Sequence, residues 1–302
     1  MPKFKTLLSH RIISVIGLGN PEPMYQNTRH NVAATVMKTM WSQLATLKET
    51  QAWTPHKLIA RTRAEPNTKQ FKRHISKFFD EKVITHKKPA TKPRYILNLN
   101  LKHAYHEGIK MLLVTPTIDL NNEYDGPPLK LYDYDFAKRF DLYRKTFCFG
   151  YIDNTFMNSN GAVVSKFFSE QHAFFKEQLK DVKYYKDAAP ATKYTFSNYI
   201  MADDVDTPIG KIKISDKHSS DRGHNGVRDC TKYMGANDDM SYVKIFVGIS
   251  LSKWKNDIFS KLLLRDFVLG EFTPEEMDYL KENTVPMIWY ELHKMETIVA
   301  AK

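Results

Sequence analysis

The sequence has few of the residues that build disulfide and metal sites. It contains only two cysteines, Cys148 and Cys230. They form no CxxC pair, so neither a disulfide framework nor a structural zinc site is expected, and a reducing compartment is favoured. No HExxH or similar spacing of metal ligands occurs. A G-x-S-x-G motif is also missing, and neither cysteine lies in an evidently activating setting, so no nucleophilic side chain is indicated.

Long apolar runs and early acidic residues are missing as well. No run of about 18 apolar residues occurs, so we expect no membrane span. The first acidic residue is Glu22, and residues 1–10 form a short basic extension. An acid-free basic start resembles a mitochondrial targeting segment, so we expect a mitochondrial protein, with the cytoplasm as the alternative compartment.

Basic residues outnumber acidic ones by 45 to 34, which gives a net charge of +11. This excess suggests a polyanionic partner such as nucleic acid, although a basic protein with a solvated face has the same composition. Residues 57–110 alone hold 14 Lys or Arg against four Asp or Glu. We expect additional contacts with tRNA or ribosomal RNA from this stretch; the alternative is a decoration without a binding role.

Strand and helix patterns alternate along the chain. Apolar and β-branched runs predict strands, and periodic apolar positions next to capping residues predict helices. The alternation predicts one α/β domain over 11–302, a three-layer sandwich in which helices cover both faces of a twisted mixed sheet. The expected strands are 11–19, 57–64, 95–101, 110–117, 146–152, 194–204, 210–215 and 242–250; the expected helices are 28–49, the later parts of 155–168 and 223–235, and 273–283.

Helix ends are marked by specific residues. Thr28 is expected to cap the first helix and Gly235 to close the third. Thr273, followed by Pro274 and Glu276, has the pattern of a capping box.

Two segments interrupt the alternation. Residues 65–145 are irregular in composition, and we expect an insertion there, partly mobile, that forms an added subdomain. Residues 169–193 are rich in lysine and are expected to be a smaller insertion, either linker-like or helical.

The stretch "VIGLGNPEPMYQNTRHN" begins like a dinucleotide-binding loop, because a strand is followed by Gly17 and Gly19. The third glycine of such a loop is missing: Glu22 stands where a pyrophosphate needs a residue without a side chain. No acidic residue for a ribose contact supports the motif either. The sequence therefore argues against a dinucleotide-dependent oxidoreductase.

Polar residues follow several of the predicted strands, at the sheet edge where open α/β folds bind ligands. Asn20, Asn158, Asp203 and the pair His224–Asn225 have this placement, and His30 lies near a helix start. Each has an ordinary structural explanation, such as a turn, a cap or a packed side chain. Their recurrence at successive strand ends favours a common site.

Such residues can support hydrolysis by water. The imidazole of histidine has an ordinary pKa of about 6.5 and can accept a proton from water near neutral pH. A carboxylate bonded to the other ring nitrogen fixes the tautomer and stabilises the imidazolium. Asparagine can donate a hydrogen bond to an oxyanion or hold the attacking water.

Six blocks of the sequence follow one another in the order of a known family: "GLGNPEPMYQNTRHNV", "TFMNSNG", "DDVDTPIGKIKI", "RGHNGVRD", "VGIS" and "FVLGEFTPEE". Through them the chain resembles the bacterial-type peptidyl-tRNA hydrolase family over 11–49, 146–168 and 194–302. The polar segment 215–222 is longer than in bacterial members and closer to fungal ones. The resemblance implies hydrolysis of the ester between peptide and tRNA without metal or cofactor, by a protein that is usually a monomer.

The resemblance also implies roles for individual residues. His30 would be the general base, Asp203 the partner that orients it, and Asn20 a contact to the tRNA 3′ end or the peptide near the ester. The substrate-binding set would be Tyr25, Met157, Asn158, His224 at the rim, and Asn225. In this set Asn158, beside Met157, would bind the peptidyl backbone and support the oxyanion, and Asn225 would position water and substrate. Lys213 and Lys244 would bind tRNA phosphates.

Some positions depart from the family pattern. Asn160 replaces the usual serine of the "MNxSG" block, and Ser250 replaces a glycine. A catalytically silent RNA-binding relative, such as an organellar ribosome or splicing component, is the alternative reading, and the basic insertion favours it. The intact pair of His30 and Asp203 favours the enzyme, because a binder needs no base together with its partner.

Overall fold

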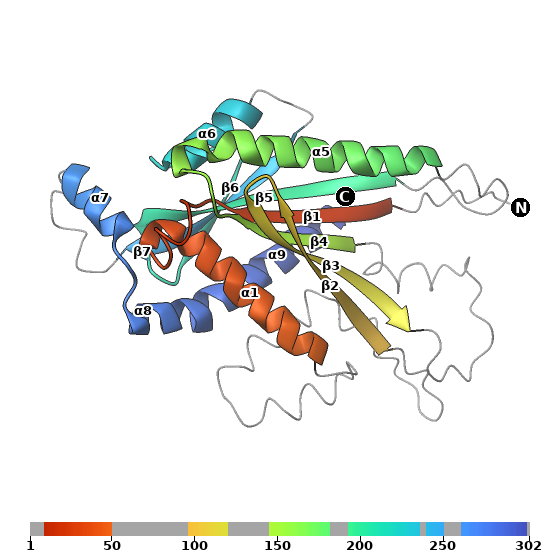
Figure 1. Ribbon diagram of the computed structural model, residues 1–302, viewed down its shortest axis with the longest axis horizontal. Helices are drawn as coiled ribbons and strands as arrows, with labels where there is room; N and C mark the ends of the chain where they lie inside the picture. The colour runs from red at the N-terminus through yellow and green to blue at the C-terminus, as the bar shows by residue number, and fades with distance from the viewer. Residues whose placement is uncertain are drawn as a thin grey trace, which may run out of the picture.

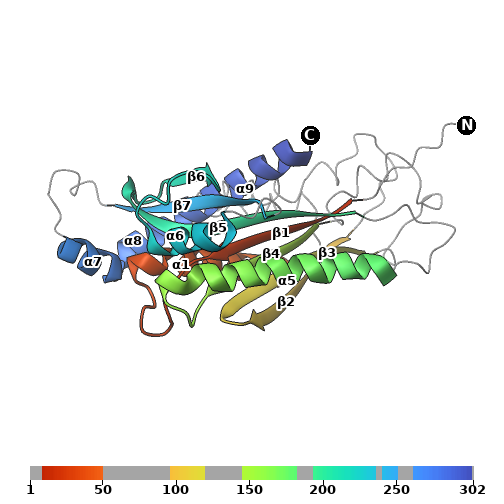
Figure 2. The ribbon, with the colours of Figure 1, turned by 90° about the horizontal axis from the view of Figure 1, so that it is seen from above.

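The computed structural model describes residues 9–49, 96–119, 145–181, 193–235, 240–250 and 261–300. The strand expected at 57–64, most of the basic stretch 57–110 and residues 1–8 lie outside these ranges. Within them the chain forms one mixed sheet with helices on both faces (Figure 1, Figure 2). The predicted fold class is therefore confirmed.

The sheet has seven strands in the order β2-β3-β4-β1-β5-β7-β6. Its centre is parallel, because β4, β1, β5 and β7 run the same way, and its two edges are antiparallel. The apolar centre suits strands that are buried on both faces. The strands are β1 Ser9–Gly17, β2 Ile96–His106, β3 Ile109–Asp119, β4 Lys145–Ile152, β5 Lys193–Pro208, β6 Ile212–Asp216 and β7 Tyr242–Ser250.

Two hydrophobic layers hold the helices against the sheet. On one face, helices α1 and α9 pack on residues such as Val15 and Phe149; on the other, α5 and α6 pack on residues such as Ile16 and Phe246. Neighbouring residues of one strand thus serve opposite layers, as the strand period of two requires. The helices are α1 Val32–Glu49, α5 Asn160–Asp181, α6 Asn225–Met234, α7 Lys261–Leu269, α8 Pro274–Tyr279 and α9 Val285–Ala300, with the short 3₁₀ turns η1 Arg29–Asn31 and η5 Met157–Ser159 and the π-helical segment η8 Leu280–Thr284.

The predicted helix ends are partly right. Thr273 and Glu276 form the expected capping box at α8, and Gly235 ends α6. The prediction for Thr28 is wrong, since its hydroxyl donates to the Tyr25 carbonyl at 2.9 Å and makes no cap hydrogen bond. Helices α7 and α9 were not predicted.

The described part of the insertion belongs to the main sheet. Residues 96–119 form the β2–β3 hairpin, and β3 pairs antiparallel with β4. The strands expected at 95–101 and 110–117 are therefore confirmed, but they extend the sheet and are not a separate subdomain. Helix α5 continues through Asp181, so residues 169–181 are helical. No described helix is both long and apolar enough to cross a membrane.

Candidate active site

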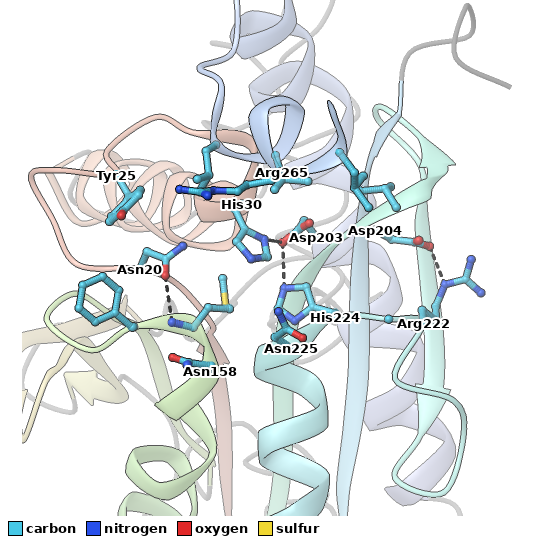
Figure 3. A pocket seen from close by; sticks show the side chains of 17 residues that line it. Asn20, Tyr25, His30, Asn158, Asp203, Asp204, Arg222, His224, Asn225 and Arg265 are labelled. Atoms are coloured by element: carbon cyan, nitrogen blue, oxygen red, sulfur yellow. Dashed lines mark hydrogen bonds and ion pairs between the residues drawn. The ribbon is translucent and has the colours of Figure 1, made fainter. Parts of the chain in front are cut away.

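A cavity of about 610 Å³ lies at the carboxyl end of the parallel strands β1, β4 and β5, where α/β sheets usually bind ligands. Its wall brings together segments that are far apart in the sequence (Figure 3). Eight of the predicted site residues line it: Asn20, Tyr25, His30, Met157, Asn158, Asp203, His224 and Asn225.

His30 and Asp203 form a close pair in this cavity. Nδ1 of His30 lies 2.6 Å from Oδ1 of Asp203, and the Asp203 side chain is only 3% exposed. The turn η1 places His30 just before α1, and Asp203 comes from β5. Because an ionised carboxylate only accepts hydrogen bonds, Nδ1 carries the proton and Nε2 of the neutral ring carries the lone pair. His30 therefore offers a basic nitrogen held in one orientation.

His224 binds the same oxygen from the other side. It is the N-cap of α6, and its Nδ1 accepts the Val227 N–H at 3.1 Å. The ring proton is therefore on Nε2, which lies 2.9 Å from Oδ1 of Asp203. Figure 3 shows the carboxylate between the two imidazoles. The prediction that His224 lies at the rim is wrong, because this residue is buried and bonded to the buried Asp203.

The pair shifts both pKa values in the direction that a general base needs. Burial alone would lower the pKa of His30, but the charge of Asp203 and the hydrogen bond to it raise that pKa above its ordinary value. Burial alone would raise the pKa of Asp203, yet His30 and His224 together hold it below its ordinary range. Asp203 therefore stays ionised wherever His30 titrates.

Asn20 has a fixed amide orientation. Its Oδ1 accepts the backbone N–H of Met157 at 2.9 Å, so the oxygen is engaged and Nδ2 remains as a donor on the cavity side (Figure 3). A fixed N–H donor beside a general base is what stabilisation of an oxyanion requires.

Two further buried asparagines hold this arrangement in place. Asn31 bonds both the N–H and the carbonyl of Asn20, at 2.8 and 3.0 Å. Asn160 accepts the Gly19 N–H at 2.9 Å and donates to the Phe156 carbonyl at 2.9 Å. The change from serine to asparagine at 160 thus touches the support of the site. Sequence reasoning assigned neither residue a role, although both stand inside the blocks that carry the resemblance.

Helix α7 closes one side of the cavity with Leu264, Arg265, Val268 and Leu269, none of which was predicted. Arg29, the neighbour of His30, reaches the segment that follows α7. Its guanidinium donates to both carboxylate oxygens of Glu276, at 2.7 and 3.0 Å, and to the Glu271 carbonyl. A largely buried ion pair therefore joins the turn that carries the base to α8, the helix that follows the wall helix α7.

Asp204, the neighbour of Asp203, has a structural role. Its buried carboxylate accepts the Nε–H of Arg222 at 2.8 Å, and it also bonds Thr207. This holds Arg222, which has a left-handed backbone with φ of 54°, in the cavity wall. A cation thus lies beside the site without contacting the pair of His30 and Asp203.

The two predicted phosphate contacts lie outside the cavity wall and differ from each other. The Lys213 side chain is 45% exposed, which leaves its ammonium accessible. Lys244 is 1% exposed, and its Nζ donates to the Ser219 carbonyl at 2.6 Å. A buried ammonium that donates to a carbonyl is not accessible to a phosphate. In this structure Lys244 instead stabilises the segment 215–222 through its hydrogen bond to Ser219.

The described residues contain one group that could hold a metal ion: His30, Asp203 and His224. The chemistry of the donors does not fit a metal. The Val227 N–H occupies Nδ1 of His224, so Nε2 is protonated and has no lone pair for a cation. The same contacts instead suit a hydrogen-bonded carboxylate with two imidazoles.

A family model described as peptidyl-tRNA hydrolase matches residues 14–91 and 144–288 of the chain. Among curated proteins, a peptidyl-tRNA hydrolase of Porphyromonas gingivalis is 32% identical over 131 residues, which are 43% of this chain and 55% of that protein. A probable peptidyl-tRNA hydrolase of Schizosaccharomyces pombe is 27% identical over 107 residues, 35% of this chain and 48% of that protein. The chain spans about half the length of these relatives.

Solved structures give a weaker comparison. A crystal structure of a mutant peptidyl-tRNA hydrolase from Acinetobacter baumannii aligns with 93% of this chain and 94% of its own, at 17% identity and a TM-score of 0.36. A similarity of this size carries no conclusion about function.

Proposed function

The chain belongs to the peptidyl-tRNA hydrolase family, and from this premise we propose that it hydrolyses the ester bond between peptide and tRNA in peptidyl-tRNA, which recycles tRNA from aborted translation. The observation that carries the proposal is the 2.6 Å contact between His30 and Asp203 in the wall of the cavity, with the fixed amide of Asn20 in the same wall. A base, its partner and an oxyanion donor are the parts that hydrolysis by water needs.

The reaction follows from this geometry. Nε2 of His30 takes a proton from water while the water oxygen attacks the ester carbonyl carbon. Asp203 stabilises the imidazolium that forms, and Nδ2 of Asn20 donates to the oxyanion. When the tetrahedral intermediate collapses, the bond between the carbonyl carbon and the 3′-oxygen of tRNA breaks, and the imidazolium returns the proton to that oxygen. The products are a peptide with a free carboxyl group and a free tRNA.

The rest of the wall suits binding of the peptide and the tRNA end. Tyr25, Met157, Asn158 and Asn225 present an aromatic ring, a thioether and two amides to the cavity. Mixed apolar and amide surface can take a peptide of variable sequence, because the backbone amides of the peptide supply the constant polar groups. His224 lines the same cavity and is bonded to Asp203, so it also supports the carboxylate that orients the base.

The test is release of labelled peptide from an N-blocked aminoacyl-tRNA. The wild type should hydrolyse it, and His30→Ala should lower the rate by about 10² to 10⁴, the usual contribution of a general base. His218→Ala, which removes an exposed histidine, is the matched control and should keep the wild-type rate. A wild type that binds the tRNA but releases no peptide would overturn the proposal in favour of a silent RNA-binding relative. Nothing in the described site favours that alternative.

Binding of tRNA rests on charge. We infer phosphate contacts from the exposed Lys213 and additional RNA contacts from the basic stretch 57–110. Each lost phosphate contact reduces the salt dependence of binding, so Lys213→Ala should reduce the slope of log affinity against log salt by about 1. Substituting Lys87, Lys88 and Lys92 by Gln tests the basic stretch in the same assay. An unchanged slope would leave that stretch without a binding role.

Compartment and oligomeric state are further proposals. We infer a mitochondrial protein from the acid-free residues before Glu22, with the cytoplasm as the alternative, and a monomer from the family. Imaging of the full chain with a fluorescent protein at its C-terminus distinguishes the compartments. Light scattering coupled to size exclusion gives the mass, which should be near 35.2 kDa.

A further inference from the structure

The β2–β3 hairpin ends beside the cavity. Its tip, residues 105–110, is here called the hairpin turn, and it meets the segment 153–158 that follows β4 and is here called the β4 loop (Figure 1). The β4 loop carries Phe156, Met157 and Asn158, all of which line the cavity. The hairpin itself lies in the part of the chain, 92–143, that the family model does not match. An element outside the family match thus contacts a loop that lines the site.

The hairpin turn contacts the first two residues of the β4 loop. The Gly108 carbonyl accepts the Asp153 N–H at 3.0 Å, and the Tyr105 hydroxyl accepts from Nδ2 of Asn154 at 2.9 Å. Lys110 adds an ion pair with Asp153 at 2.8 Å. The loop is therefore fixed at its start by the hairpin.

The turn is shaped to allow this approach. Glu107 and Gly108 both have a left-handed backbone, with φ of 44° and 94°, as a tight two-residue hairpin turn requires. A Cβ at position 108 would lie 2.1 Å from Oδ1 of Asn154. Only glycine therefore combines this backbone with contact to the loop.

The other end of the β4 loop is held by the site itself. Met157 donates its N–H to Asn20, and Asn160 bonds the carbonyls of Thr155 and Phe156. Asp153 and Asn154 stand only three or four residues before Met157 in the same loop, so a displacement of either should also move Met157. None of these contacts involves His30 or Asp203.

We propose that the β2–β3 hairpin positions the β4 loop for substrate, with Tyr105 and Gly108 as positioning residues. This inference rests on the proposed function. It predicts that the hairpin acts on substrate binding and on the Asn20 donor while the base and its partner remain intact. The RNA contacts proposed for the stretch 57–110 are a separate property.

The test is kcat/KM for peptidyl-tRNA across pH in the full chain. Tyr105→Phe removes one hydrogen bond and should lower kcat/KM about three- to tenfold at every pH. Gly108→Ala, which adds a clash and backbone strain, should lower it more. The acid limb, which is the pH range where kcat/KM falls as the pH is lowered, should lie at the wild-type pH in both variants. Glu107→Gln, in the same turn but paired with Lys166 of α5 at 2.6 Å, is the control and should leave kcat/KM unchanged.

A double-mutant cycle separates positioning from general destabilisation. Asn154→Ala removes the partner of Tyr105, so the combined variant should lose no more activity than the larger single loss. Additive losses, an unchanged kcat/KM in Tyr105→Phe, or a moved acid limb would each overturn the inference. A wild type without activity would overturn the proposed function itself, so the two failures are distinguishable.

Discussion

Arg29 and Glu276 join the turn that carries the base to helix α8 through a two-pronged ion pair, with Nη2 of Arg29 at 2.7 and 3.0 Å from the two carboxylate oxygens. The same carboxylate completes the capping box with Thr273. The guanidinium also lies 4.9 Å from the ring centre of Phe267 and 5.2 Å from that of Phe272. One arginine therefore links the turn, the helix and the end of α7.

Arg29→Lys should lower the free energy of unfolding by about 2 kcal/mol, because lysine keeps the charge but loses the planar fork and its stacking on the rings. Urea unfolding measures the change. The control is Lys281→Ala, which breaks an exposed ion pair with Asp278 and should cost less than about 1 kcal/mol. Equal effects of the two variants would contradict a structural link through Arg29.

The pH dependence follows from the shift at His30. Its pKa is raised by Asp203, so the neutral base is lost as the pH falls through a value above the ordinary 6.5. The acid limb of kcat/KM should therefore lie above pH 6.5. Asp203→Asn removes the charge, and burial then lowers the pKa of His30, so the limb should move to lower pH while the plateau falls by about 10² or more.

Kinetics over pH 5 to 9, with NMR titration of the His30 ring in the slow variant, check this prediction. His224→Ala should give a smaller shift of the limb, because Asp203 remains beside His30. An Asp203→Asn variant with the wild-type limb would show that Asp203 does not set the pKa of the base.

Much of the site follows from the sequence for a physical reason. Parallel strands end at one edge, so polar residues after β1 and β4 and near the end of β5 meet there whatever their separation along the chain. The two hydrogen bonds between the Asn31 side chain and the backbone of Asn20 do not follow from the sequence in this way. Polar residues in a loop are as compatible with exposure to water as with burial, and only the fold shows that Asn20 and Asn31 are both buried.

The burial of Lys244, by contrast, could have been predicted from the alternation of residues along its strand. Along β7, Tyr242, Lys244 and Phe246 share one face by the strand period of two, and that face lies under α5 and α6. In a central strand covered on both sides, alternation places the lysine stem in the core. The hydrogen bond from the Lys244 ammonium to the Ser219 carbonyl depends on the path of the segment 215–222, and no local sequence pattern specifies that path.

Asn20 offers a substitution that separates catalysis from folding. Asn20→Asp keeps an oxygen for the Met157 N–H but replaces the Nδ2 donor by a negative charge facing the oxyanion. We expect kcat to fall about 10² to 10³, as when an oxyanion donor is lost. Thermal unfolding should change little. Asn283→Asp, a change at an exposed residue outside the cavity wall, is the control, and a kcat of Asn20→Asp near the wild-type value would exclude Asn20 as the donor.

Lys213 and Lys244 give opposite predictions when each is replaced by methionine. Lys244→Met keeps an apolar stem in the core but leaves the Ser219 carbonyl without its donor, so the free energy of unfolding should fall by about 1 kcal/mol. The salt dependence of tRNA binding should not change, because the buried ammonium contacts no phosphate. Lys213→Met should change stability little, because the Lys213 side chain is 45% exposed and its ammonium is 4.0 Å from the Asp204 carboxylate, too far for a hydrogen bond.

Filter binding to tRNA at several salt concentrations, paired with urea unfolding, distinguishes the two lysines. Burial lowers the pKa of Lys244, although Asp221 and Asp216 oppose this, so the ammonium is easier to deprotonate than an exposed one. Between the lowered pKa of Lys244 and the ordinary pKa of lysine, the unfolded chain binds more protons than the folded one, so titration of this group should raise the free energy of unfolding as the pH rises. A reduced salt slope in Lys244→Met would mean that this side chain leaves the core to meet tRNA, and the assignment to loop support would then be wrong.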